Sequence, residues 1–124
     1  MTHKILVVDD SVTVRQQVSL ALTQAGFSVV EASDGVDGLM QIGHHPDLSL
    51  VLCDVNMPRM DGIAMLEQMK ANGARASLPV LMLTTEAAPA LVDRAKKAGA
   101  KGWIVKPFKP ELLVGAVRKL TLAS

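Results

Sequence analysis

The stretch LSLVLCDVNMPRMDG (residues 48–62) decides how the rest of the chain is organised. Its first six residues are apolar apart from Ser49, which is typical of a strand buried on both faces of a parallel sheet. Asp54 follows directly, at the carboxyl end of that strand. Open α/β sheets bind their ligands in the crevice outside the carboxyl ends of the strands. The stretch therefore predicts a central strand that delivers one acid to the ligand-binding edge of a sheet.

The composition bounds the class of protein. The chain has 124 residues, 49% of them hydrophobic, and we expect a single domain over residues 1–124 with its own core. The net charge of +1 argues against nucleic acid or an anionic membrane as a partner. The one cysteine, Cys53, rules out an internal disulfide and suits a reducing compartment. The apolar run at residues 5–8 is too short for a signal or spanning segment, so we expect a cytoplasmic protein.

Strand-like and helix-like patterns alternate along the chain. Strands are predicted at residues 5–8, 28–32, 48–53, 80–85 and 102–106, with 28–32 as a sheet edge. Helices are predicted to follow each strand, and four of them begin at residues typical of helix starts: Ser11, Asp61, Pro89 and Pro110. This alternation predicts an α/β fold, a (βα)5 doubly wound parallel five-stranded sheet with helices on both faces.

Periodicity also predicts which side of two helices faces the core. In the helix at residues 33–42, Val36, Leu39 and Met40 fall on one stripe, although three glycines weaken the helical pattern. In the helix that begins at Pro110, Leu112 and Leu113 are both expected on the buried side.

Polar side chains stand at the carboxyl ends of four of the predicted strands: Asp9 and Asp10, then Asp54, Thr84 and Lys106. If the first and third strands are neighbours, these groups converge on one crevice. Carboxylates this close cannot all stay ionised without a cation, and an oxygen-only site open to water favours Mg²⁺. A carboxylate beside Mg²⁺, with an ammonium and a hydroxyl in reach, is equipped to attack phosphorus and form an acyl phosphate.

Taken together, these motifs resemble the receiver domain of two-component response regulators. The acids in VVDDS, the acid in LCDVNMPRMDG, the hydroxyl in MLTTE and the lysine in VKPF occur in the family's order, over essentially the whole chain. The resemblance implies a flavodoxin-like, CheY-like sheet with strand order 2-1-3-4-5. It also implies a phosphorelay in which Asp54 accepts a phosphoryl group from a histidine kinase.

The resemblance further implies the role of each site residue. The metal ligands for Mg²⁺ are expected to be Asp9, Asp10, Asp54 and the backbone carbonyl of Asn56, with Asp9 acting directly or through water. Thr84 and Lys106 are expected to hold the phosphoryl oxygens. The bond between Lys106 and Pro107 is expected to be cis.

Three further positions concern switching and output. Trp103 occupies the family's aromatic switch position and is expected to swing inward when Thr84 moves. Asn56 and Glu86 are the residue types that most resemble those of the single-domain chemotaxis regulators at these positions. Both residues are expected to modulate dephosphorylation. The implied partners are a chemotaxis-type histidine kinase, a downstream target such as a flagellar switch protein, and a phosphatase. We expect a monomer that catalyses only its own phosphorylation and dephosphorylation.

Several alternatives stay open at this point. The same site would serve a phosphate sink, a regulator of pili, or a receiver excised from a hybrid kinase or a transcription factor. A hydrolase of the haloacid dehalogenase kind would want a second acid where Asn56 stands. A flavodoxin-type cofactor carrier would need a phosphate-binding loop after the first strand, where Asp9 and Asp10 would repel the phosphate.

Overall fold

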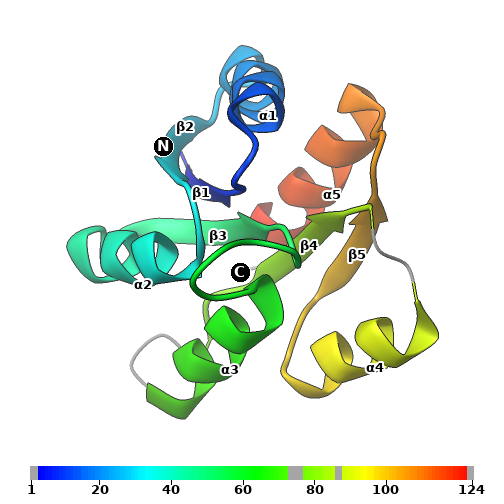
Figure 1. Cartoon of the computed structure of the whole chain (residues 1–124). Helices are drawn as coiled ribbons and strands as arrows, with labels where there is room; N and C mark the ends of the chain where they lie inside the picture. Colours follow the sequence, from blue (N-terminus) through cyan, green and yellow to red (C-terminus); the bar gives the residue numbers. More distant parts are fainter. Residues whose placement is uncertain (1–2, 73–76, 86–87, 123–124) are drawn as a thin grey trace.

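The computed structural model describes residues 3–72, 77–85 and 88–122, which form strands and helices in strict alternation (Figure 1). Among these residues, no helix is long and apolar enough to cross a bilayer. The elements, in chain order, are β1 (Lys4–Val8), α1 (Val12–Gln24), β2 (Ser28–Ala32), α2 (Gly35–His44), β3 (Leu48–Cys53), α3 (Gly62–Asn72), β4 (Val80–Thr84), α4 (Pro89–Lys97), β5 (Gly102–Val105) and α5 (Pro110–Leu122).

The strands pair in parallel, in the order β2-β1-β3-β4-β5. This confirms the predicted doubly wound (βα)5 sheet, and it places β2 at an edge. The order makes β1 and β3 neighbours, with Val8 paired to Cys53 at their carboxyl ends. β4 and β5 each end one residue earlier than the sequence pattern predicts, so Lys106 lies just beyond its strand.

Both faces of the sheet are buried, which explains why the central strands read as nearly continuous apolar runs. Successive strand residues point to opposite faces. Leu50 and Leu52 therefore belong to one core layer, together with α1 and α5, whereas Val51 and Cys53 belong to the other, together with α2, α3 and α4. Figure 1 shows these two helix layers on either side of the sheet. Cys53 is fully buried, as its place in an apolar strand predicts.

The predicted helix starts are supported by capping contacts. The Ser11 hydroxyl accepts a hydrogen bond from the Val14 amide at 3.3 Å, and an Asp61 carboxylate oxygen accepts one from the Ala64 amide at 2.8 Å. These side chains satisfy amides that have no partner within the helix. At the other end of α1, Gly26 has φ of +96°, a conformation that glycine adopts without steric cost.

Two core predictions were wrong. Met40 is 54% exposed and Leu112 is 62% exposed. In α2 the buried face is made by Gly35, Gly38 and Ile42, because the glycines let the helix pack closely against the β3–α3 loop and α3, which turns Met40 outward. In α5, adjacent residues are about 100° apart around the helix axis, so Leu113 takes the core position and Leu112 cannot share it.

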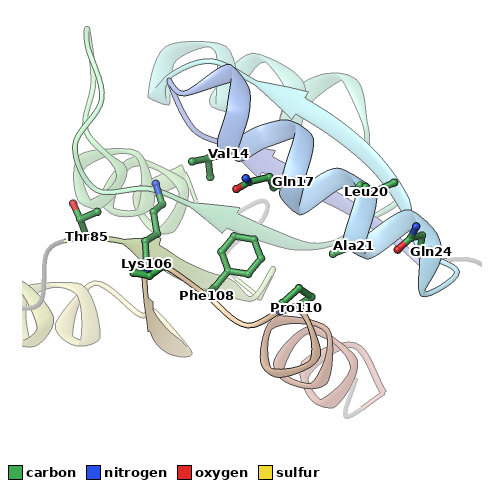
Figure 2. Close-up of a pocket in the computed structure, with 10 residues that line it drawn as sticks. Val14, Gln17, Leu20, Ala21, Gln24, Thr85, Lys106, Phe108 and Pro110 are labelled. Carbon is green, nitrogen blue, oxygen red and sulfur yellow. The ribbon is translucent and has the colours of Figure 1, made fainter.

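An open apolar groove lies between α1 and the segment that leads into α5 (Figure 2). We call it the α1 groove; its volume is about 630 Å³. Leu20, which is 60% exposed, lies on its α1 side, the Phe108 ring lies opposite, and Lys106 stands at one end. The full lining is Val14, Gln17, Leu20, Ala21, Gln24, Thr85, Lys106, Pro107, Phe108 and Pro110.

Candidate functional site

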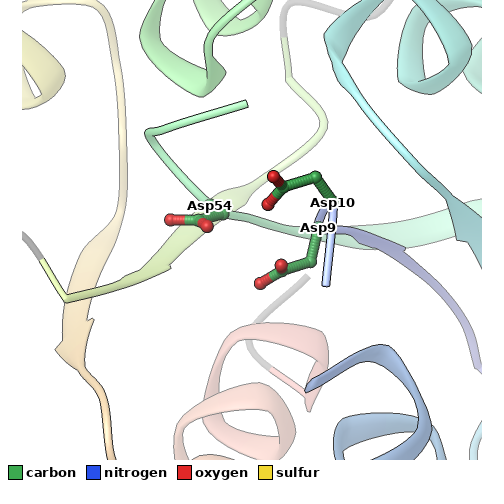
Figure 3. Close-up of side chains that lie close together, drawn as sticks. All are labelled: Asp9, Asp10 and Asp54. Carbon is green, nitrogen blue, oxygen red and sulfur yellow. The ribbon is translucent and has the colours of Figure 1, made fainter. Parts of the chain in front are cut away.

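Acids from two neighbouring strands meet at the carboxyl edge of the sheet. Asp9 and Asp10 follow β1, and Asp54 follows β3; one carboxylate oxygen from each lies within 4.8 Å of the others. Figure 3 shows that the three side chains lie close together. Asp9 and Asp54 are buried, and Asp10 is exposed. The predicted convergence of these acids is therefore observed, and we call Asp9, Asp10 and Asp54 the acid cluster.

Backbone amides orient the two buried acids. One Asp54 oxygen accepts a hydrogen bond from the Val55 amide at 2.7 Å, and the Asp54 amide itself donates to the Val8 carbonyl at 2.9 Å. One Asp9 oxygen accepts a hydrogen bond from the Ser11 amide at 2.9 Å. Each buried acid thus keeps its second carboxylate oxygen for another partner.

That partner is Lys106, which reaches the acids from the loop after β5. Its ammonium nitrogen lies 2.7 Å from Oδ2 of Asp9 and 3.3 Å from Oδ2 of Asp54. The Lys106–Pro107 peptide bond is cis, as expected. The ammonium therefore bridges the acids of the first and third strands.

The electrostatics of the site reflect crowding of like charges in a buried place. Burial raises the pKa of Asp9 above its ordinary value, and the charge of Asp54 adds to this, while the hydrogen bond from Lys106 opposes it. Burial alone would lower the pKa of Lys106, but the hydrogen bond to Asp9 and the charges of Asp54 and Asp9 raise it overall. Three acids lie together and the one ammonium contacts two of them, Asp9 and Asp54, so a further cation would be stabilised here, and the oxygen-only donor set fits Mg²⁺.

The remaining predicted site residues lie nearby or outside the described residues. Thr84 is fully buried at the end of β4, and its backbone carbonyl accepts a hydrogen bond from the Lys106 amide at 2.8 Å. Asn56 is exposed in the loop that joins β3 to α3. Glu86 lies outside the described residues.

Trp103 lies in β5 and is not one of the three acids that meet at the edge of the sheet. It is partly buried in β5 and pairs with Met82 of β4. Thr84 follows Met82 by two residues, so Thr84 and Trp103 lie on the same face of the sheet. Trp103 lines a cavity of about 60 Å³ together with Val92 and Ala95 of α4. Trp103 is thus placed between the end of β4 and α4.

Known proteins share this architecture. The family model of the response regulator receiver domain matches residues 5–118. The chain belongs to the response regulator receiver family. Within the family, this receiver is similar to the chemotaxis protein CheY1 of Helicobacter pylori, with 38% identity over 111 residues that cover 89% of this chain and 90% of that protein.

Solved structures agree with this assignment. Chemotaxis protein CheY4 of Vibrio cholerae has 38% identity and a TM-score of 0.90, over 97% of this chain and 99% of that chain. A CheX–CheY–BeF3–Mg complex from Borrelia burgdorferi has 30% identity and a TM-score of 0.89, over 95% of this chain and 88% of that chain. The chain is thus a CheY-like receiver, and its class of function is two-component response regulation.

Reasoning from the sequence missed two residues that support the receiver's acids. Arg15 of α1 donates a hydrogen bond to the backbone carbonyl of Asp9 at 2.6 Å and pairs with Glu31 of β2 at 3.2 Å. Gly62 begins α3 so close to Asp54 that a Cβ there would overlap the Asp54 carbonyl oxygen. The DG in the quoted stretch predicts only a helix start, and nothing local to Arg15 marks its contacts with residues 6 and 16 positions away.

Proposed function

We propose that this receiver accepts a phosphoryl group on Asp54 from the phosphohistidine of a histidine kinase, in a Mg²⁺-dependent reaction. The observation that carries the proposal is the contact of one partly buried ammonium, that of Lys106, with both Asp9 and Asp54. A buried carboxylate beside a cation is an anionic nucleophile, which needs no general base. The phosphorylated form then binds a downstream protein.

In the transfer, a bond forms between an Asp54 oxygen and phosphorus as the bond from phosphorus to the donor's imidazole nitrogen breaks. Asp9, Asp10, Asp54 and the Asn56 carbonyl would hold Mg²⁺, which supplies charge neutralisation at the transferring phosphoryl oxygens. Lys106 adds a second positive charge from the opposite loop, and the Thr84 hydroxyl donates a hydrogen bond to a phosphoryl oxygen. Beyond its own phosphorylation and dephosphorylation, which Asn56 and Glu86 modulate, the receiver catalyses no reaction.

The phosphoryl donor approaches along the α1 groove. This groove is mostly apolar and has Lys106 at one end, so a protein seated in it would bring a phosphohistidine toward the acid cluster. The apolar lining favours a protein surface as occupant, because a small phosphorylated metabolite offers little apolar area to bury.

Phosphorylation is read out through Thr84, Trp103 and α4. When the Thr84 hydroxyl turns toward the phosphoryl group, it leaves space on the face that Trp103 shares. Val92 and Ala95 of α4 line the cavity beside Trp103, so inward movement of the indole ring is coupled to a shift of α4. α4 buries only Ala95 among its nine residues, all described, so a shift disrupts little packing.

The relatives point to chemotaxis as the pathway. The Helicobacter pylori and Vibrio cholerae relatives named above are chemotaxis proteins, and one solved neighbour is a CheX–CheY complex with BeF3 and Mg. We infer a monomeric cytoplasmic regulator with a chemotaxis-type kinase, a downstream target such as a flagellar switch protein, and a phosphatase as partners.

The test is covalent labelling followed by intact mass measurement. Wild type incubated with Mg²⁺ and either acetyl phosphate or a phosphorylated kinase should gain one phosphoryl group, and Asp54→Asn should gain none. Asp93→Asn is the matched control, because Asp93 is an exposed acid on α4 that pairs with Lys97; it should be labelled like wild type. Labelling of Asp54→Asn at the wild-type rate would move the acceptor elsewhere and refute the proposal.

A further inference from the structure

An ion pair outside the acid cluster ties the loop after Asp54 to the start of α2. The Arg59 guanidinium donates two hydrogen bonds to the Asp34 carboxylate, from Nε to Oδ2 at 2.7 Å and from Nη2 to Oδ1 at 3.1 Å. Asp34 is 7% exposed, whereas Arg59 is 60% exposed. A bidentate pair of this kind fixes the orientation of the guanidinium as well as its distance.

Asp34 is itself held in place. Its Oδ1 accepts a hydrogen bond from the Asp37 amide at 2.9 Å, which caps α2. Beside it, the Gly35 amide donates to the Met60 carbonyl at 3.1 Å, so backbone and side chain both join α2 to this loop. The carboxylate that Arg59 contacts is therefore a rigid anchor.

Arg59 adopts a backbone conformation that its side chain disfavours. Its φ is +63°, and it is the one residue other than glycine with a positive φ among the described residues. Glycine or asparagine adopts this conformation at less cost. The strained backbone conformation at Arg59 places the guanidinium in contact with Asp34, which indicates that this side chain has a structural role in the loop.

The loop that Arg59 anchors also carries Asn56, three residues earlier. It begins at Asp54 and closes with a hydrogen bond from the Gly62 amide to the Val55 carbonyl at 2.9 Å. Any movement of this loop shifts the Asn56 carbonyl relative to the acids, while Asp9 and Asp10 stay on a different strand. The position of Arg59 thus affects where the loop, with the Asn56 carbonyl, lies relative to the acid cluster.

We propose that Arg59 is a positioning residue: through Asp34 it holds the β3–α3 loop so that the Asn56 carbonyl faces the divalent cation, and it thereby sets the affinity of the site for Mg²⁺. The inference rests on the proposed Mg²⁺-dependent phosphoacceptor function. Residues behind metal ligands commonly change affinity by about 10- to 100-fold when they are removed.

The direction of the effect separates positioning from simple electrostatics. Removing the positive charge of Arg59 should by electrostatics alone tighten Mg²⁺ binding, and removing the negative charge of Asp34 should weaken it. Positioning predicts that both changes weaken binding. Because the two residues act as one unit, the double variant should then be no weaker than the poorer single variant.

The experiment is a Mg²⁺ titration of the folded protein, in which the backbone amide NMR signals report metal binding. Arg59→Asn keeps a residue that tolerates positive φ, and Asp34→Ser keeps a hydroxyl that can cap α2. Each should bind Mg²⁺ about tenfold more weakly than wild type. The Gly62 amide should also exchange with solvent faster in both variants. Arg94→Asn is the charge-matched control, because it breaks an exposed pair with Glu67 and should leave Mg²⁺ affinity unchanged.

Each outcome decides between the claims. Tighter binding by Arg59→Asn, or wild-type affinity in both variants, overturns the positioning role while leaving the phosphoacceptor proposal intact. If wild type itself fails to bind Mg²⁺, the proposed function fails, and this inference fails with it. Should Asp34→Ser not fold, Arg59→Asn alone carries the test, because only at Arg59 do electrostatics and positioning predict opposite effects. Should Arg59→Asn not fold, Arg59→Gly takes its place, since glycine also tolerates a positive φ.

Discussion

The Lys106 ammonium lies 2.7 Å from a carboxylate oxygen of Asp9, although the two residues are 97 positions apart in the chain. The contact joins the loop after the last strand to the turn after the first. It makes Lys106 the cation that offsets the crowded acids within the protein itself. A bound Mg²⁺ would neutralise the same acids, so the stability of the protein and its metal affinity are linked through this pair.

Replacing Lys106 by alanine should destabilise the metal-free protein, because it leaves two buried carboxylates without their ammonium. Breaking a buried pair from one side costs about 3 kcal/mol. The pKa of Lys106 is raised in the folded state, so its stabilising contribution is complete below pH 10.5 and is lost as the pH rises through the higher folded value. Urea unfolding at pH 7 in EDTA measures the loss. Addition of Mg²⁺ should restore stability more in the variant than in wild type; equal restoration would contradict the link.

Replacing Asp9 by asparagine should have the opposite effect on the metal-free protein at neutral pH. The folded protein holds the Asp9 pKa above 3.8, mainly by burial, so the stability that Asp9 contributes is present below that pH and lost as the pH rises through the folded value. We expect Asp9→Asn to be more stable than wild type at pH 7 by about 1 kcal/mol, with the gain vanishing toward pH 3.8. The check is the difference in the free energy of unfolding between Asp9→Asn and wild type, measured by urea unfolding in EDTA between pH 3.5 and 7. A stability gain that does not change with pH would refute the prediction.

Replacing Gly62 by alanine should lower both the stability of the receiver and the rate at which Asp54 is phosphorylated. The new Cβ would overlap the Asp54 carbonyl oxygen, so the start of α3 must shift, at a cost of about 1–3 kcal/mol. The acetyl phosphate labelling rate should fall as well, since Asp54 moves with its backbone. Gly115→Ala is the control: Gly115 lies in α5 with open space around it, and alanine there should stabilise by up to about 1 kcal/mol. A Gly62→Ala protein with wild-type stability and labelling would show that the contact is unimportant.

Replacing Leu20 by alanine should separate the two kinds of phosphoryl donor. Leu20 lies in the α1 groove and is 60% exposed, so its loss should change stability by less than about 0.5 kcal/mol. Transfer from a phosphorylated kinase should slow severalfold, while labelling by acetyl phosphate stays at the wild-type rate. Val12→Ala is the control, an exposed α1 residue outside the groove lining. Equal kinase transfer in both variants would remove the α1 groove from the reaction.

Much of the fold could be predicted because its signals are local. The apolar runs of β1, β3 and β4 and the caps at Ser11 and Asp61 follow from periods of two and 3.6 residues and from helix-end chemistry. Met40 and Leu112 were placed wrongly because a helix can turn either of two adjacent apolar stripes inward. Which stripe faces the core depends on the neighbouring elements. In α2, Gly38 approaches Met65 of α3 closely, and in α5, Leu113 is the buried residue.

The candidate site also has features that the sequence predicts and features that it does not. That the acids after β1 and β3 would meet could be predicted, because the carboxyl ends of parallel strands share one edge. Which acid would be buried against Lys106 could not, since Asp9 and Asp10 are chemically identical neighbours in sequence. The turn of the backbone into α1, secured by Ser11 and Arg15, buries Asp9 and leaves Asp10 exposed.

The sequence by itself determined the order of strands and helices along the chain and which chemical groups end each strand, because both depend on residues within one or two turns of each other. Only the tertiary structure decided that Lys106 bridges Asp9 and Asp54, that Arg59 anchors the loop after Asp54 to Asp34, and that α1 faces an open groove. These contacts join residues 25 to 97 positions apart. Their geometry is set by strand order and register together, and no local pattern in the chain encodes it.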